Sequence, residues 1–111
     1  MALDDAEGKE EKSDLIRVRM EIIFSEALEE DFQQEFKERK IGMHYTKYAN
    51  VMGAGYSNPH LGDSVWPQLN IAYVIYCSKE EAKQIRQVVL KLRKKYLTEG
   101  IACFMSQAVE L

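Results

Sequence analysis

The order in which two hydrophobic periodicities follow one another constrains this fold more than any other feature of the sequence. Apolar residues at every second position indicate a β-strand with one covered face, whereas a spacing of three to four residues indicates an amphipathic helix. Along the chain these patterns run strand, helix, strand, strand, helix, strand. We therefore predict an α+β, ferredoxin-like βαββαβ sandwich, with a four-stranded antiparallel sheet and two helices on one face.

Four segments carry the strand pattern. In the first, the apolar residues of one face alternate with Arg17, Arg19 and Glu21 on the other. The third is apolar on both faces, so we expect it to be central in the sheet. In the second, we expect Tyr45, Ala49 and Val51 to share one face. The segments are Leu15–Phe24, Met43–Val51, Leu69–Cys77 and Ile101–Val109.

Two segments carry the helix pattern. The first has an apolar stripe at Leu28, Phe32 and Phe36 and should end near Gly42. The second opens with Ser78 and Glu81, which we interpret as a capping box, and should stop by Gly100. Cations crowd its last turns, where they complement the helix dipole. Its predicted stripe is Ala82, Ile85, Val89, Leu92 and Tyr96.

Such a sheet leaves one face without helices. A large, partly apolar face on a small domain usually associates with another surface, so we predict a homo-oligomer. Arg17, Arg19 and Glu21 would supply polar pairs within or beside that contact.

Length and charge narrow the class of protein. The 111 residues suit one domain, which we assign to residues 15–111, preceded by a charged, disordered tail over residues 1–14. We expect no membrane-spanning segment and no signal peptide, and hence a cytoplasmic protein. A net charge of -3 argues against a nucleic-acid binder.

The two cysteines are expected to be reduced. Cys77 and Cys103 should lie on strands separated by the first strand, so we expect two core thiols and no disulfide.

Residues 52–68, between the second and third strands, are the functional candidate. The segment holds half of the six glycines, both prolines and the only tryptophan. A connection of this length is unusual in a compact domain and is typically functional. The plainer alternative is a long turn in which Gly53 and Gly55 supply positive φ and Trp66 packs on the sheet edge. In the functional interpretation the two glycines let the backbone approach a ligand closely.

The same segment resembles a known family. Val51-Met52-Gly53-Ala54-Gly55 is similar to the V-x-G-x-G that opens the T-loop of P-II signalling proteins, and Trp66-Pro67-Gln68-Leu69-Asn70-Ile71 is similar to their entry into the third strand. The order and length of the elements from Leu15 to Val109 also match. The resemblance implies a homotrimer with its sheets facing inward, an adenine nucleotide or other small effector in the clefts between subunits, and a T-loop that engages a protein partner.

The resemblance also assigns residues. The implied ligand site comprises Gly53, Ala54, Gly55 and Tyr56, and the loop would present Tyr56, Leu61 and Trp66 to the partner. P-II proteins hold phosphates on a glycine-rich loop, which Leu97-Thr98-Glu99-Gly100 replaces here, so Lys94 and Lys95 are the candidate phosphate ligands. Tyr56 lies too near the loop start to match the tyrosine that P-II proteins carry as a uridylylation site. The sequence does not identify a cofactor.

Two other functions remain open. A CutA-like trimer of the same architecture would bind a divalent metal near His60 and Asp63, although His44, His60, Asp63, Cys77 and Cys103 show no metal-ligand spacing. A small dimeric ferredoxin-like enzyme is the other alternative, but no nucleophile or general base has a positioned partner, so we assign no catalytic residue.

Overall fold

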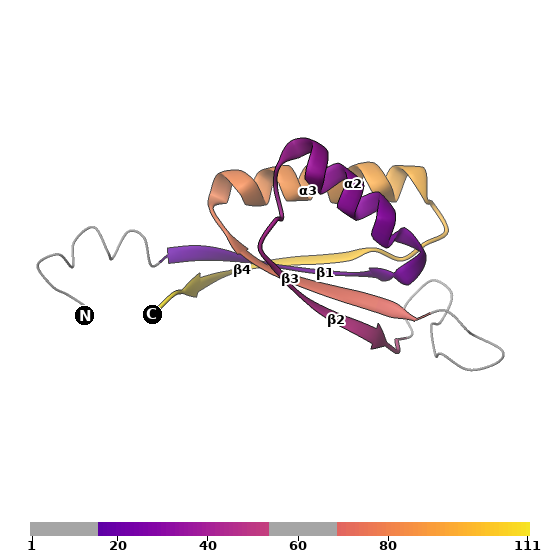
Figure 1. Ribbon diagram of the computed structural model, residues 1–111, viewed down its shortest axis with the longest axis horizontal. Coiled ribbons are helices and arrows are strands. Elements are labelled where there is room, and N and C mark those ends of the chain that lie inside the picture. Colours follow the sequence, from indigo (N-terminus) through magenta and orange to yellow (C-terminus); the bar gives the residue numbers. More distant parts are fainter. Residues whose placement is uncertain (1–15, 54–68) are drawn as a thin grey trace, which may run out of the picture.

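The computed structural model describes residues 16–53 and 69–111. In these residues the elements follow the predicted order, with one short 3-10 helix, η1, added after the first strand (Figure 1). The elements are β1 (Ile16–Ser25), η1 (Glu26–Leu28), α2 (Glu29–Arg39), β2 (Tyr45–Val51), β3 (Asn70–Cys77), α3 (Lys79–Lys95) and β4 (Ala102–Val109).

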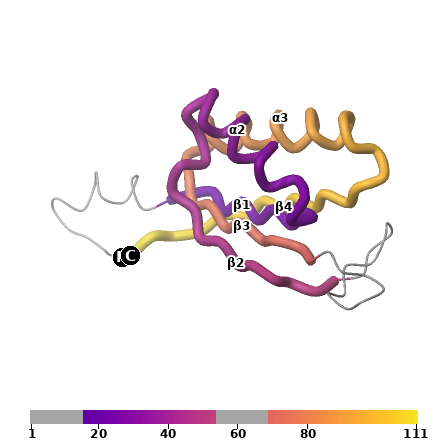
Figure 2. Tube along the Cα trace, turned by 45° about the vertical axis from the view of Figure 1, so that its right-hand side comes forward, coloured from indigo at the N-terminus to yellow at the C-terminus, as the bar shows by residue number. Residues whose placement is uncertain are grey.

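The four strands form one antiparallel sheet in the order β2-β3-β1-β4. Met20 of β1 lies opposite Ile75 of β3 and Met105 of β4. Both helices lie on the same side of this sheet (Figure 2). The predicted α+β, ferredoxin-like arrangement is therefore confirmed, as is the central position of the third strand.

β1 separates the two cysteines, and both are free thiols, as predicted. Only Cys77 is a core thiol, because Cys103 on the edge strand β4 is half-buried. Burial is the main reason that the pKa of Cys77 is raised to about 11.

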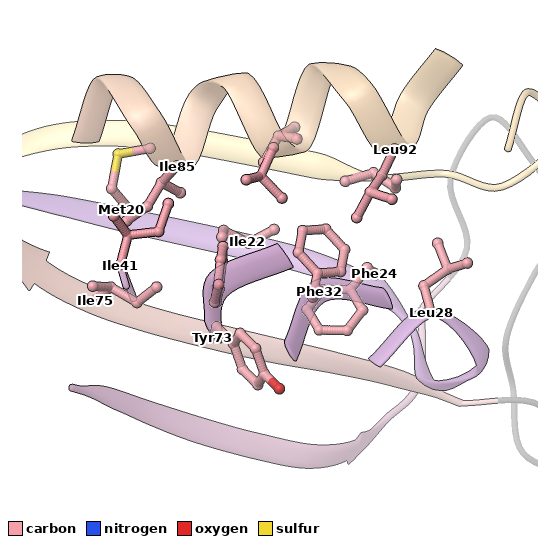
Figure 3. Packing of buried hydrophobic residues seen from close by; sticks show 14 of the residues in the cluster. Met20, Ile22, Phe24, Leu28, Phe32, Ile41, Tyr73, Ile75, Ile85 and Leu92 are labelled. Atoms are coloured by element: carbon pink, nitrogen blue, oxygen red, sulfur yellow. The ribbon is translucent and has the colours of Figure 1, made fainter. Parts of the chain in front are cut away.

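The core lies between the sheet and the helix layer (Figure 3). Aromatic rings fill its centre: Phe24 lies 4.3 Å from Phe32 and 5.1 Å from Tyr73 between ring centroids. Aliphatic side chains of α3 pack against these rings and the sheet from the helix layer. The buried cluster includes Met20, Ile22, Phe24, Phe32, Phe36, Ile71, Tyr73, Ile75, Ile85, Val89 and Leu92.

α2 ends through two residues with left-handed backbone geometry. Lys40 has a φ of 58° and Gly42 a φ of 62°, and the Ile41 N–H donates to the carbonyl of Phe36. A Cβ on Gly42 would lie only 2.7 Å from the Phe36 ring, so the turn requires glycine there for both space and φ. The helix therefore ends three residues before Gly42, close to the predicted stop.

The predicted capping box at α3 is half correct. The Ser78 hydroxyl accepts a hydrogen bond from the Glu81 backbone N–H at 3.1 Å, as such a box requires. The Glu81 carboxylate, however, accepts a hydrogen bond from the Gly42 N–H at 2.7 Å. That N–H belongs to the turn after α2, so Glu81 ties the two helices together. α3 ends at Lys95, earlier than Gly100, and the next residue, Tyr96, lies against the core.

A register shift in β2 overturns one predicted face. Tyr48 lies opposite Ala72, but Val51 lies opposite Asn70, so one extra residue is inserted between them, and Asn50 has a φ of 59°. This β-bulge moves Val51 to the face of Tyr48. The prediction that Tyr45, Ala49 and Val51 share one face is therefore wrong, because an inserted residue reverses the alternation that follows it.

Within the described residues no helix covers the second face of the sheet (Figure 2). Large apolar or aromatic side chains are exposed along it: Tyr48, Tyr76 and Phe104. Ion pairs within the chain lie among or beside them: Arg19 lies 3.6 Å from Glu21, and Arg17 lies 3.0 Å from Glu110.

Candidate functional site

The base of the 52–68 segment lies at one end of the sheet, where β2 ends and β3 begins (Figure 1). Val51 is paired with Asn70 there, and Gly53 forms a single β-bridge. The φ of Gly53 is not positive, so the turn alternative, in which Gly53 supplies positive φ, is wrong for this residue. Its missing side chain serves close packing, because a Cβ would lie 3.0 Å from the Asn70 side-chain nitrogen.

Glu26 of η1 holds the start of β3. Its backbone N–H donates to the Leu69 carbonyl at 2.9 Å, and its carboxylate accepts a hydrogen bond from the Leu69 N–H at 3.3 Å. Leu69 is therefore bound through both of its backbone polar groups.

Glu29, in the first turn of α2, holds β2 in a similar way. The Lys47 ammonium lies 2.8 Å from one carboxylate oxygen of Glu29 and 3.0 Å from the other. The Tyr73 hydroxyl donates to Glu29 at 2.7 Å and accepts a hydrogen bond from the Gln33 amide at 2.7 Å. Partial burial raises the pKa of Glu29, but the hydrogen bonds from Lys47 and Tyr73 outweigh that effect, and the net pKa is lowered.

These contacts were not predicted from the sequence, in which Glu29 belongs to a charged helix surface and Tyr73 to an apolar strand. One signal pointed to them. A tyrosine at a position that must be buried needs a partner for its hydroxyl. The sequence does not say which residue supplies that partner.

Lys94 and Lys95 occupy the last turn of α3 and are exposed. Beside them the Arg93 side chain donates to the Ile101 carbonyl at 3.0 Å, which holds the connection to β4. A shallow hollow of about 860 Å³ lies along this part of the helix, lined by Gln87, Leu90, Lys91, Arg93, Lys94, Lys95 and Leu97.

The surroundings of these lysines are strongly basic. From Ala82 to Thr98 the chain has six Lys or Arg residues and no Asp or Glu, although its net charge is -3. Lys91 is bound to Glu35 of α2 at 2.5 Å. The cations therefore do more than complement the helix dipole, because one of them also joins the two helices.

The structure places the two described parts of the predicted ligand site at the same end of the molecule but beside opposite edges of the sheet. Gly53 follows β2, which is one edge strand, and Lys94 and Lys95 precede β4, which is the other. α3 runs back along the sheet from the end of β3, which brings its last turn to the end where β2 stops (Figure 1). One chain therefore does not bring Gly53 and the two lysines together.

The remaining predicted site residues lie outside the described residues. They are Ala54, Gly55, Tyr56, Leu61 and Trp66 of the ligand and partner assignments, and His60 and Asp63 of the metal alternative.

Within residues 16–53 and 69–111 the structure contains no group of three or more His, Cys, Asp or Glu side chains that could hold a metal ion. His44 instead lines a hollow of about 550 Å³ on the helix-free face, together with Arg17, Tyr76, Ala108, Val109 and Glu110. None of the described helices is both long and apolar enough to span a bilayer.

Comparison with known proteins gives matches among solved structures only. No protein-family model and no curated sequence matches the chain. CPII, a nitrogen regulatory PII-like protein from Thiomonas intermedia K12 bound to ADP, AMP and bicarbonate, superposes with a TM-score of 0.65 at 14% identity, over 86% of this chain and 90% of that one.

A putative PII-like signaling protein from Thermus thermophilus gives a TM-score of 0.62 at 18% identity, over 85% of this chain and 88% of that one. The apo form of CPII gives 0.55 at 11% identity, over 86% and 95%. At such identities the likeness defines the fold and nothing finer. The predicted resemblance is confirmed at that level: this chain has the fold of PII-like proteins.

Proposed function

We propose that this chain is a PII-like regulatory protein rather than an enzyme. It would form a homotrimer, bind an adenine nucleotide at the clefts between subunits, and signal to a protein partner through the 52–68 loop. One observation carries the proposal. This chain shares its fold with CPII over 86% of its length, and its own long connection between β2 and β3 begins with Met52-Gly53-Ala54-Gly55.

The distribution of the site residues supports an assembly of copies. Gly53 lies beside one edge of the sheet, and Lys94 and Lys95 lie beside the other. In a closed ring each subunit presents one patch of its surface to a different patch of its neighbour, so the two edges of the sheet can meet across the contact. A ligand between two subunits would thus meet the loop base of one copy and the lysines of the next.

The exposed side chains of the helix-free face support the same assembly. Tyr48, Tyr76 and Phe104 project from three different strands of that face. Burying them against other copies would release apolar surface from water, which is the main driving force for association.

The few phosphate-binding groups near Lys94 and Lys95 limit which nucleotides we expect this site to bind. A phosphate group needs backbone N–H donors or cations, and the turn after α3 contains Glu99 and a single glycine. The C-terminal end of a helix also repels anions, so Lys94 and Lys95 must supply the positive potential. A short phosphate chain places the smallest demand on such a site, and the CPII structures hold ADP and AMP. We therefore name ADP and AMP as the first effectors to test.

The outward signal would come from the loop. Tyr56, Leu61 and Trp66 are the side chains we assign to the partner, because aromatic and large aliphatic residues carry most of the binding energy in protein interfaces. The cytoplasmic location expected from the sequence is part of the same proposal.

Native mass spectrometry tests the proposal, since one spectrum reports the number of subunits and the bound mass. We expect a trimer that gains up to three molecules of ADP or AMP. The double variant Lys94→Ala/Lys95→Ala should remain trimeric and bind nucleotide at least about tenfold more weakly, because each lost contact is charge-assisted. Lys83→Ala, which removes an exposed cation near the other end of α3, is the matched control.

Other outcomes would contradict the proposal in distinct ways. A monomer or dimer would remove the assembly on which the site depends and would favour the alternative of a small dimeric enzyme. A trimer that ignores nucleotide but gains a divalent metal, and loses the metal in His60→Ala, would favour the CutA-like alternative.

A further inference from the structure

Both flanks of the 52–68 loop are bound to the same short piece of chain. Glu26 of η1 holds Leu69, immediately after the loop, through two hydrogen bonds. Glu29, three residues later, holds Lys47 of β2, the strand that leads into the loop. We call residues 26–33, which comprise η1 and the first five residues of α2, the helix corner.

β2 needs this support because its other attachments are few. Among the described residues it is paired with β3 alone, at the edge of the sheet, and all its residues except Val51 are exposed. The bulge at Asn50 interrupts the pairing just before the loop. Edge strands with broken ladders open more readily than central strands do.

Tyr73 of β3 anchors the contact between Glu29 and β2, because it is itself held in the core. Its side chain is fully buried, and its ring lies 5.1 Å from Phe24 and 4.7 Å from Tyr45 of β2 between centroids. Figure 3 shows the ring at the margin of the core cluster, with its hydroxyl directed away from the other labelled side chains. That hydroxyl bonds to both Glu29 and Gln33, so the carboxylate that receives Lys47 is itself held in position.

Tyr73 and Lys47 lie directly opposite each other in the β3–β2 register. A side chain of the central strand and one of the edge strand therefore meet on a single carboxylate of the helix layer. On the other flank of the 52–68 segment, the Glu26 carboxylate accepts a hydrogen bond from the Leu69 N–H. The two flanks of the loop cannot move independently of the helix corner while these bonds are made.

We propose that the helix corner positions the loop, with Glu29, Tyr73 and Lys47 fixing its β2 flank and Glu26 fixing its β3 flank. Tyr73 and Glu29 are positioning residues. They act on the loop through β2 and need not touch a ligand. The consequence for ligand binding rests on the proposed function, whereas the consequence for β2 does not.

Hydrogen exchange of backbone amides in the full chain, measured without ligand, tests the first consequence. Lys47→Met removes the ion pair at an exposed position and leaves the core untouched. We expect exchange over residues 45–53 to become about tenfold faster, with β1 unchanged. Lys47→Arg, which keeps a cation opposite Glu29, should restore the slow exchange. Tyr73→Phe keeps the ring and removes the hydroxyl, and should act in the same direction as Lys47→Met.

Lys91→Met is the matched control, because it breaks an ion pair of the same kind between α3 and Glu35 on the other side of α2. It should leave exchange over residues 45–53 unchanged. If Lys47→Met also leaves these residues unchanged, or if Lys91→Met accelerates them equally, the positioning role is overturned. Acceleration spread evenly over all strands would overturn it as well, since that would be global destabilisation.

A nucleotide titration separates this inference from the proposed function. If the wild-type protein binds ADP, Lys47→Met should weaken binding several-fold while the trimer persists, and unchanged affinity would overturn the link to the ligand. If the wild-type protein binds no nucleotide at all, the proposed function fails, and the exchange data still decide whether the helix corner holds β2.

Discussion

Two left-handed positions after α2 show how single residues set the path of the chain. At Gly42 the backbone and the Phe36 ring both exclude a Cβ, whereas at Lys40 the chain tolerates a strained lysine. We expect Gly42→Ala to lower the free energy of unfolding by about 2 kcal/mol or more and Lys40→Gly to raise it by up to about 1 kcal/mol. Urea unfolding monitored by circular dichroism measures both. Equal stability of Gly42→Ala and the wild type would contradict the structure.

Single carboxylates also set the acid sensitivity. Hydrogen bonding from Lys91 is the main reason that the pKa of Glu35 is lowered, and the pKa of Glu29 is lowered as well. A carboxyl group with a lowered folded-state pKa stabilises the fold above its unfolded pKa of about 4.3, and this stabilisation is lost as the pH falls through the folded value.

We therefore expect the unfolding free energy to fall between about pH 5 and pH 3, and to fall less steeply in Glu35→Gln. Urea titrations at several pH values, with Glu38→Gln as the control, measure this difference. Glu38 lies on the same helix, where it contacts Gln34 and no cation among the described residues. Parallel pH profiles for the wild type and Glu35→Gln would contradict the assignment.

At the scale of elements, each helix depends on a contact at its start. α2 begins with Glu29, which holds the β2 flank of the loop, and Glu26 of the preceding η1 holds the β3 flank. α3 begins with Ser78, whose hydroxyl accepts from the Glu81 N–H, and with Glu81, whose carboxylate binds the turn after α2. The helix starts therefore connect the elements to one another as well as satisfying their own backbone groups.

The contact of Ser78 predicts a helix-specific loss of stability. Ser78→Ala removes the side-chain acceptor and should cost about 1 kcal/mol, whereas Ser78→Asp keeps an acceptor and should cost little. Thermal and urea unfolding of both variants give the comparison. Equal losses in the two variants would mean that the hydroxyl does not cap α3.

At the scale of the whole molecule, the two faces of the sheet differ in role. One face packs against the helices, and the other presents Tyr48, Tyr76 and Phe104 to its surroundings. In a trimer of the proposed kind these side chains would lie between subunits. Charges introduced there should therefore affect assembly and leave folding intact.

Phe104→Glu tests this division. Phe104 is 61% exposed and lies opposite Glu21, so a second carboxylate at that position should repel it in a buried interface while costing the single chain little. We expect loss of the trimer with unchanged secondary structure, measured by native mass spectrometry and circular dichroism. Lys83→Glu, at an exposed position near the other end of α3, should stay trimeric. A Phe104→Glu variant that remains fully trimeric would exclude this face as the interface.

Periodicity determined the order of the elements and the central place of the third strand, because these properties follow from local repeats along the chain. The handedness of the crossover connections then placed both helices on one face. The sequence also marked residues 52–68 by their glycines and prolines. Three features depended on the tertiary structure: the reversed face of Val51, the partner of the Glu81 carboxylate, and the contacts of Tyr73 with Glu29 and Gln33. Each joins residues distant in sequence, or depends on where one strand slips against its neighbour, and neither distance nor register leaves a trace in a local pattern. The placing of Gly53 and of Lys94 and Lys95 at opposite edges, by contrast, already follows from the predicted order of elements, because right-handed crossovers make the second and fourth strands the edges of the sheet.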